Sequence, residues 1–173
     1  MHIENVANKL PEFAKDIKLN FGQVLSEEGA PDLSQKQIAF IALGVAYAIK
    51  NSPLIAELEA NNSNLLESEI KAIKSAAVIM AMNNIYYRFV HLTSDKSFAT
   101  MPAKLRMNVL ANPGIDKIDF ELICLAISAI NGCGMCIDAH TKVLINSGIS
   151  KLAIQSSIRI AAVLNATALG IEI

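Results

Sequence analysis

Apolar residues recur every three or four positions along nearly the whole chain, which is the spacing of one face of an α-helix. Near the start, the repeat runs through Ile3, Val6, Leu10, Phe13, Ile17 and Phe21. Pro11 is expected to interrupt that helix, because proline lacks the amide hydrogen that the helix interior needs. No alternating pattern typical of β-strands is found. The pattern predicts an all-α fold.

The later part of the chain is more regular. Helices are predicted over 67–90, 118–131, 134–147 and 150–171. A Ser34–Gln37 capping box predicts the start of an earlier helix, and Gly148 predicts the end of the one over 134–147. We expect residues 1–173 to form a single-domain bundle of about eight helices.

A weak internal repeat is visible. The stretch "AYAIKNSPLIAELEA" can be laid over "AISAINGCGMCIDAH", and "IKSAAV" matches "IRIAAV". The two copies would cover 37–90 and 118–173, and only the second carries cysteines. Because helical sequences resemble one another easily, true duplication and chance likeness both stay open.

The amino-acid composition narrows the range of possible functions. The chain is 53% hydrophobic, 18% charged and close to neutral at −1, so bulk charge gives no attraction to nucleic acid or to an anionic membrane. The uncharged stretch 122–137 contains Asn and Gly and is shorter than a spanning helix. No signal peptide pattern opens the chain. We expect a cytoplasmic protein that does not act at a membrane.

The C-terminal third carries few charges. Residues 120–173 contain six, namely Glu121, Asp138, Lys142, Lys151, Arg159 and Glu172. One small domain has too little interior to bury that much apolar surface, so we expect a subunit interface.

The segment "INGCGMCIDAHTK" carries the candidate chemistry. Asn131–Gly132 is expected to end one helix, which places Cys133 near the first turn of the next. The helix N-terminus favours a thiolate there. Cys133, Cys136 and His140 stand at i, i+3 and i+7 and therefore share one face. His140 is thus positioned to act as a base for Cys136, and the two sulfurs to close a disulfide.

Glu121 lies on the preceding helix, ten residues before the Asn131 turn. In an antiparallel hairpin its height differs from that of His140 by about 4 Å, at 1.5 Å rise per residue. A carboxylate on an otherwise apolar face needs a partner, and His140 is the nearest candidate. The spacing predicts a relay from carboxylate to imidazole to two thiols.

Other interpretations of these residues stay open. Two cysteines and one histidine leave a fourth zinc ligand unfilled, and no second cluster of such ligands exists. A tight hairpin packed with small residues and a satisfied histidine is the structural alternative. The third cysteine, Cys124, is expected to be an inert core thiol.

Three stretches together resemble a known family. "MNVLANPGIDKIDFELICLAISAINGCGMCIDAHTKVL", "LPEFAKDIKLN" and "MAMNNIYYR" are similar to the AhpD alkylhydroperoxidases, of the carboxymuconolactone decarboxylase-like superfamily. The likeness extends over nearly the whole chain, so it is far more specific than a Cys-x-x-Cys pair.

The resemblance implies an all-helical homotrimer that reduces alkyl hydroperoxides as an antioxidant, with no bound metal or other cofactor. It implies that Cys136 becomes the sulfenic acid, that Cys133 is its proton donor and disulfide partner, and that His140 and Glu121 form the relay. It also implies two protein partners. Electrons would come from a dihydrolipoyl group on a lipoyl-bearing acyltransferase and pass on to an AhpC-type peroxiredoxin.

One position departs from the family pattern. Some members have a histidine directly before the second cysteine, where this chain has Met135, so we expect slower peroxidase turnover. Physical reasoning about the pair also favours Cys133 as the more exposed sulfur. Two other functions stay open: an acid/base enzyme acting on a lactone through His140 and Glu121, and an electron adaptor for AhpC without its own peroxidase activity.

Overall fold

The computed structural model describes residues 4–173, and every regular element in that range is helical. The α-helices are α1 (Glu4–Ala7), α2 (Lys15–Val24), α3 (Gln35–Ile49), α4 (Ser52–Asn61), α5 (Glu67–Leu92), α6 (Lys117–Ile130), α7 (Gly134–Asn146) and α8 (Lys151–Glu172). Three short 3-10 helices are η1 (Glu12–Ala14), η2 (Lys96–Thr100) and η3 (Asn108–Leu110). The predicted fold class, an all-α bundle of about eight helices, is confirmed.

Local sequence determines where the helices begin and end. Ser34 accepts a hydrogen bond from the backbone N–H of Gln37 at 3.2 Å, and the Gln37 side chain accepts one from the N–H of Ser34 at 3.0 Å. This is the expected capping box at the start of α3. Asp116 caps α6 by accepting from the N–H of Ile118 at 2.8 Å. Gly148 ends α7 with φ of 82°, a left-handed conformation that favours glycine.

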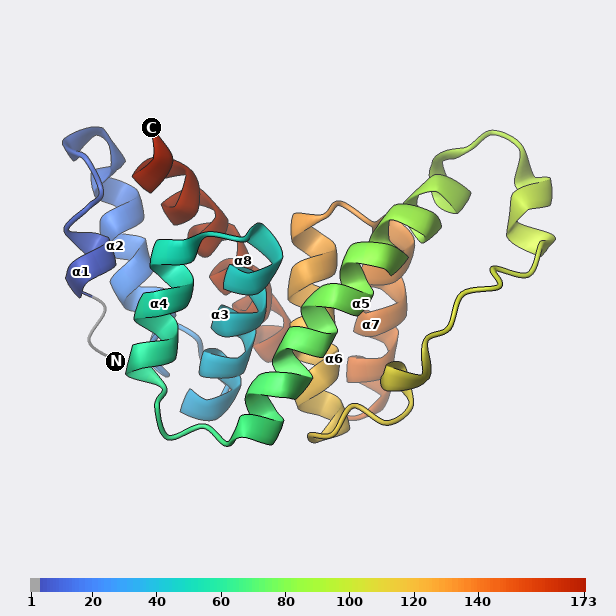
Figure 1. Ribbon diagram of the computed structural model, residues 1–173, viewed down its shortest axis with the longest axis horizontal. Helices are drawn as coiled ribbons and strands as arrows, with labels where there is room; N and C mark the ends of the chain where they lie inside the picture. Colours follow the sequence, from blue (N-terminus) through green and yellow to red (C-terminus); the bar gives the residue numbers. More distant parts are fainter. Residues whose placement is uncertain (1–3) are drawn as a thin grey trace.

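The centre of the bundle consists of α3, α6 and α8, each of which packs against the other two. Helix α5 crosses α3 and α6, α7 lies against α5 and α6, and α2 covers α8 (Figure 1). Between α5 and α6 the chain leaves the bundle as a protruding arm, residues 93–116, which carries η2 and η3 (Figure 1). Helix α6 is therefore held by four neighbours, which fixes the groups that it presents to α7.

The N-terminal segment is interrupted at Pro11, as expected: α1 ends before it, and η1 and α2 follow it. Phe13, a member of the apolar repeat, is 73% exposed. The 3-10 turn that follows Pro11 interrupts the α-helical register, so the apolar repeat does not stay on one face. Ile3, the first residue of that repeat, lies outside the described residues. The repeat positions that are buried are Val6, Leu10 and Phe21.

The two halves of the proposed repeat have the same order of elements. The range 37–90 covers α3, α4 and α5, and 118–173 covers α6, α7 and α8. In each half a residue with positive φ follows the end of the first helix, Lys50 at 59° and Gly132 at 65°. Duplication itself stays a prediction.

Helix α8 is the one helix among residues 4–173 that is long and apolar enough to cross a membrane by length and composition. It lies against α2, α3 and α6 inside the bundle and buries Ser156, Ser157 and Thr167 along with its apolar residues. The length and composition of α8 are equally those of a helix at the centre of a globular core, which is the position that α8 has here.

The close approach of α3 and α6 gives a stability prediction. A Cβ on Gly44 would lie 2.4 Å from Cγ2 of Ile123. We expect Gly44→Ala to destabilise the protein by about 1–3 kcal/mol, because overpacking forces neighbouring side chains apart. Urea denaturation measures the change.

Gly22 provides the control, since a Cβ there meets nothing within 4 Å. Gly22→Ala, in α2, is expected to stabilise the protein by up to about 1 kcal/mol through helix propensity. In the double variant Gly44→Ala/Ile123→Ala the new methyl group fills part of the space that Ile123 vacates. The loss of unfolding free energy in the double variant should therefore be smaller than the sum of the losses in the two single variants. An additive result would contradict the close contact between Gly44 and Ile123.

Candidate active site

The candidate site is built on the hairpin between α6 and α7. Helix α6 ends at Ile130 with Asn131 as its C-cap, and Gly132 turns the chain with φ of 65°, a conformation in which a side chain is strained. Cys133 is the N-cap of α7. The local sequence Asn-Gly-Cys thus ends one helix and begins the next, which places both cysteines at the positive end of the α7 dipole.

Cys133 and Cys136 are joined in a disulfide, with Cα atoms 5.3 Å apart. Sγ of Cys133 also accepts a hydrogen bond from the backbone N–H of Cys136 at 3.3 Å. Cys133 is fully buried, whereas Cys136 is 6% exposed and lines a cavity. The exposure order is the reverse of the one expected from the helix position alone, because Cys133 is covered at the turn and Cys136 faces the gap between α5 and α7.

Glu121 and His140 are in direct contact across the hairpin. Nδ1 of His140 lies 2.6 Å from Oε2 of Glu121, and Nζ of Lys117 lies 2.9 Å from Oε1 of the same carboxylate. The Glu121 side chain is 6% exposed and that of His140 is 12% exposed. An ionised carboxylate only accepts hydrogen bonds, so the Nδ1–H of His140 is the donor, which leaves Nε2 for the proton chemistry.

The environment of Glu121 decides its charge. Burial on its own raises the pKa of this carboxyl group, but hydrogen bonds and charge from His140 and Lys117 outweigh burial and leave its pKa below the ordinary value. Glu121 is therefore ionised at neutral pH, in a position where a carboxylate without a partner would be costly. Lys117 is a partner that sequence reasoning missed, although its i, i+4 spacing from Glu121 is a recognisable signal.

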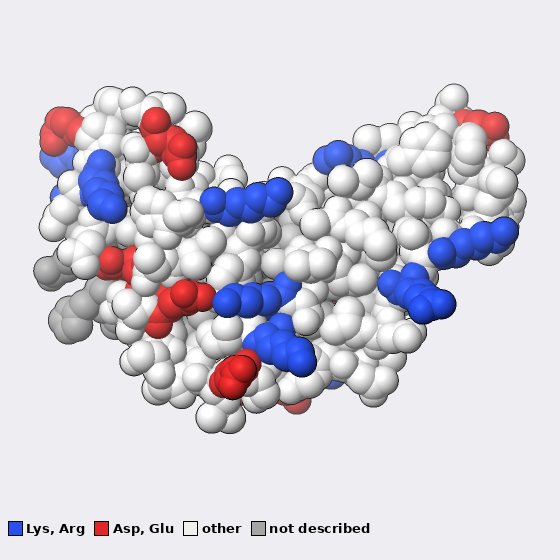
Figure 2. Space-filling model, in the orientation of Figure 1, with Lys and Arg blue, Asp and Glu red and all other residues white. Residues whose placement is uncertain are grey.

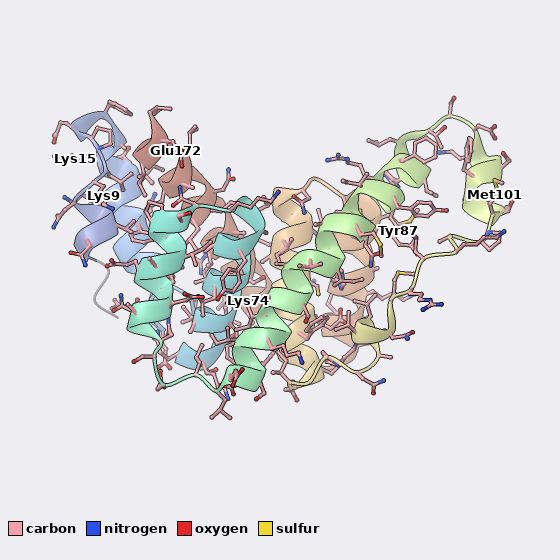
Figure 3. The ribbon with its side chains drawn as sticks, in the orientation of Figure 1. Lys9, Lys15, Lys74, Tyr87, Met101 and Glu172 are labelled. Atoms are coloured by element: carbon pink, nitrogen blue, oxygen red, sulfur yellow. A yellow bond between two sulfur atoms is a disulfide. The ribbon has the colours of Figure 1, made fainter. Side chains whose placement is uncertain are left out.

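Cys136 and His140 open into the same cavity, of about 310 Å³. The other lining residues, mostly apolar, are Met80, Asn83, Tyr87, Met107, Leu110, Met135 and Ala139. Tyr87 lies on the side of α5 that faces the returning arm (Figure 3). No hydrogen bond joins His140 to either sulfur within residues 4–173. The imidazole and the Cys136 sulfur instead share a space large enough for a small organic molecule.

A network of polar side chains next to the turn before Cys133 was not predicted from the sequence. Nδ2 of Asn84 donates to Oγ of Ser128 at 2.9 Å, and Oδ1 of Asn84 accepts from Nδ2 of Asn131 at 2.9 Å. Arg88 donates to the carbonyl oxygen of Asn131 at 2.6 Å. These bonds tie the end of α6 to α5 and so hold the turn before Cys133. No pattern in the sequence pairs residues that lie more than 40 positions apart.

The remaining cysteine has different surroundings. Cys124 lies in α6, is fully buried and is not in a disulfide. Burial raises the pKa of its thiol far above the ordinary value. Such a thiol is not a nucleophile at neutral pH, which agrees with the expectation of a core residue. Within the described part of the chain, no three His, Cys, Asp or Glu side chains are grouped so that they could hold a metal ion.

The fold and the site together define an all-helical protein with a disulfide-forming cysteine pair at a helical hairpin. Residues 96–169 match the carboxymuconolactone decarboxylase family. A Coxiella burnetii protein (strain RSA 493 / Nine Mile phase I) named alkyl hydroperoxide reductase AhpD is 58% identical over 96% of this chain and 94% of its own length.

Two further relatives bear the same name. The protein from Rhodopseudomonas palustris (strain BisA53) is 51% identical, and that from Bradyrhizobium sp. (strain ORS 278) is 50% identical. Each alignment covers 99% of this chain and 94% of the relative. The chain therefore belongs to the carboxymuconolactone decarboxylase family and, within it, to the AhpD proteins.

The lowered pKa of Glu121 predicts how its contribution to stability depends on pH. The ordinary pKa of this carboxyl group is 4.5, and in the folded state its pKa is lower. The ionised carboxylate therefore stabilises the folded protein fully above pH 4.5. This stabilisation is lost as the pH falls through the lowered pKa. We expect Glu121→Gln to cost about 2 kcal/mol at pH 6, where the wild type has charged hydrogen bonds.

Urea denaturation of both proteins between pH 6 and pH 3 measures the difference. The cost of Glu121→Gln should shrink toward pH 3, as the wild-type carboxylate takes up a proton. A cost that stays constant or grows as the pH falls would show that the charge of Glu121 contributes nothing.

Proposed function

We propose that this protein is an alkyl hydroperoxide reductase whose redox centre is the Cys133–Cys136 pair. The observation that carries the proposal is the shared cavity: Cys136 and His140 face one apolar space, and Glu121 holds the imidazole from behind. The names of the relatives support the same activity. Activation of a nucleophile needs a base and a group that orients the base, and both are present.

The proposed reaction begins with the Cys136 thiolate, favoured by the α7 N-terminus, after His140 has taken its proton. The thiolate attacks the terminal oxygen of the hydroperoxide, so that an S–O bond forms and the O–O bond breaks. Sulfur is oxidised to sulfenic acid and the peroxide is reduced to an alkoxide. Cys133 gives its proton to the alkoxide, which leaves as alcohol.

The second step closes the disulfide. The Cys133 thiolate attacks the sulfenic sulfur of Cys136, and the departing hydroxide takes the proton from the His140 imidazolium to form water. One hydroperoxide and two thiols thus give alcohol, water and the disulfide. Glu121 stabilises the imidazolium between the steps. Met135, where some family members have histidine, supplies no additional proton carrier, so we expect turnover to depend on His140.

A dithiol must then reset the pair by exchange. We propose a dihydrolipoyl group, carried by a lipoyl-bearing acyltransferase, as the donor, and an AhpC-type peroxiredoxin as a second electron acceptor in the cytoplasm. These partners rest on the family likeness. Both partners must reach the disulfide from the cavity side, where Cys136 forms part of the lining.

We also propose that the protein works as a homotrimer. Val78, Ile85, Phe89 and Leu92 form an apolar stripe on α5 and are 50–73% exposed. A depression of about 560 Å³ includes Val78 and Ile85 of this stripe in its lining. Figure 2 shows that most of the surface over α5 and the protruding arm is uncharged. An apolar surface of this kind is typical of a subunit interface.

Replacement of single cysteines tests the function. Cys136→Ser removes the attacking sulfur, and Cys133→Ser removes its partner, so each should lower steady-state cumene hydroperoxide consumption with dihydrolipoamide at least about 100-fold. Cys124→Ser is the matched control and should keep most of the activity, because Cys124 does not reach the cavity.

The same variants separate the proposal from its alternatives. Full hydroperoxide turnover in Cys133→Ser would contradict the disulfide cycle. An acid/base enzyme acting on a lactone would keep its activity in that variant, because it needs only His140 and Glu121. If the protein is an electron adaptor without its own peroxidase activity, hydroperoxide is consumed only when AhpC is added to the assay.

A further inference from the structure

Asn83 has a buried polar atom without a partner. The residue is 4% exposed, and its side-chain Oδ1 accepts no hydrogen bond from any described residue. Leaving a buried carbonyl unpaired is unfavourable, and such groups are uncommon in folded proteins. Within residues 4–173 nothing compensates Asn83 for this cost, so a bound molecule is the natural candidate for its partner.

The neighbouring residue shows that α5 can satisfy an asparagine. Asn84 uses both ends of its amide, toward Ser128 and Asn131 on the α6 side. Asn83, one residue earlier, lines the cavity on the α7 side. Its backbone carbonyl oxygen lies 4.0 Å from Sγ of Cys136, so the residue is placed directly beside the sulfur.

The cavity offers few other polar groups. Three of the residues that line it are methionines, Met80, Met107 and Met135. The hydroxyl of Tyr87 is directed to Sδ of Met107 at 3.9 Å. A hydroperoxide that enters this space loses its hydrogen bonds to water and needs replacements near the attacking sulfur. The amide of Asn83 supplies both a donor and an acceptor there.

We propose that the Asn83 side-chain amide binds the hydroperoxide group of the substrate and holds its O–O bond against Cys136, while the alkyl part lies along the methionine-lined walls. The proposal rests on the proposed function. No hydrogen bond holds Oδ1, so a half-turn of the amide presents either its carbonyl to the O–H of the hydroperoxide or its NH₂ to a peroxide oxygen. Asn83 is thus a substrate-binding residue.

The test replaces the amide with an apolar side chain of similar size. In Asn83→Leu and Asn83→Met, the KM for cumene hydroperoxide should rise about tenfold, which is the loss expected for a hydrogen bond in a buried site. The rate at which dihydrolipoamide reduces the disulfide should stay within about twofold. Thermal stability should be unchanged or higher, because the unpaired buried carbonyl is gone.

Asn20→Leu is the matched control, since it makes the same exchange at an exposed position of α2 outside the cavity, and it should leave the KM unaltered. An unaltered KM in both Asn83 variants would overturn the proposal. So would a lower melting temperature with an equal loss in both half-reactions, which indicates a structural role. If the wild-type protein itself consumes no hydroperoxide, the proposed function fails and this inference fails with it.

Discussion

The contact between Glu121 and His140 is the constraint on which the rest of the site depends. A buried carboxylate requires compensation, and the structure supplies it from Lys117 on the same helix and from His140 on the next. This pair fixes the tautomer and direction of the imidazole. It also sets the alignment of α6 and α7, because the two side chains meet only when the hairpin has the observed register.

The hairpin between α6 and α7 places the reactive groups relative to this pair. Gly132 allows the turn, Cys133 caps α7, and Cys136 lies one turn deeper, beside a cavity with mainly apolar walls. Polar groups in this region are few. Oδ1 of Asn83 is a buried one that has no partner among the described residues, and Asn83 lies beside the reacting sulfur. A group left unpaired where a substrate must be held is the kind of local cost that function imposes on a fold.

Much of the architecture could be predicted from sequence, because it is local. The ends of α6, α7 and α8 follow from caps, glycines and helical periodicity, and the height match of Glu121 and His140 follows from helix geometry alone. Phe13 belongs to the apolar repeat but is exposed, because a 3-10 turn breaks the helical register there. Asn83 and the relative burial of Cys133 and Cys136 were beyond reach, because they depend on how α5, fifty residues away, packs against the hairpin.

The central claim is that the two neighbouring sulfurs cycle between thiol and disulfide on contact with a hydroperoxide. Mass spectrometry of the fully reduced protein after one equivalent of alkyl hydroperoxide tests this directly. The account predicts a loss of two hydrogen atoms that maps to the peptide containing Cys133 and Cys136, with Cys124 unchanged. Unaltered thiols at both positions, or oxidation confined to Cys124 or to methionine, would contradict it.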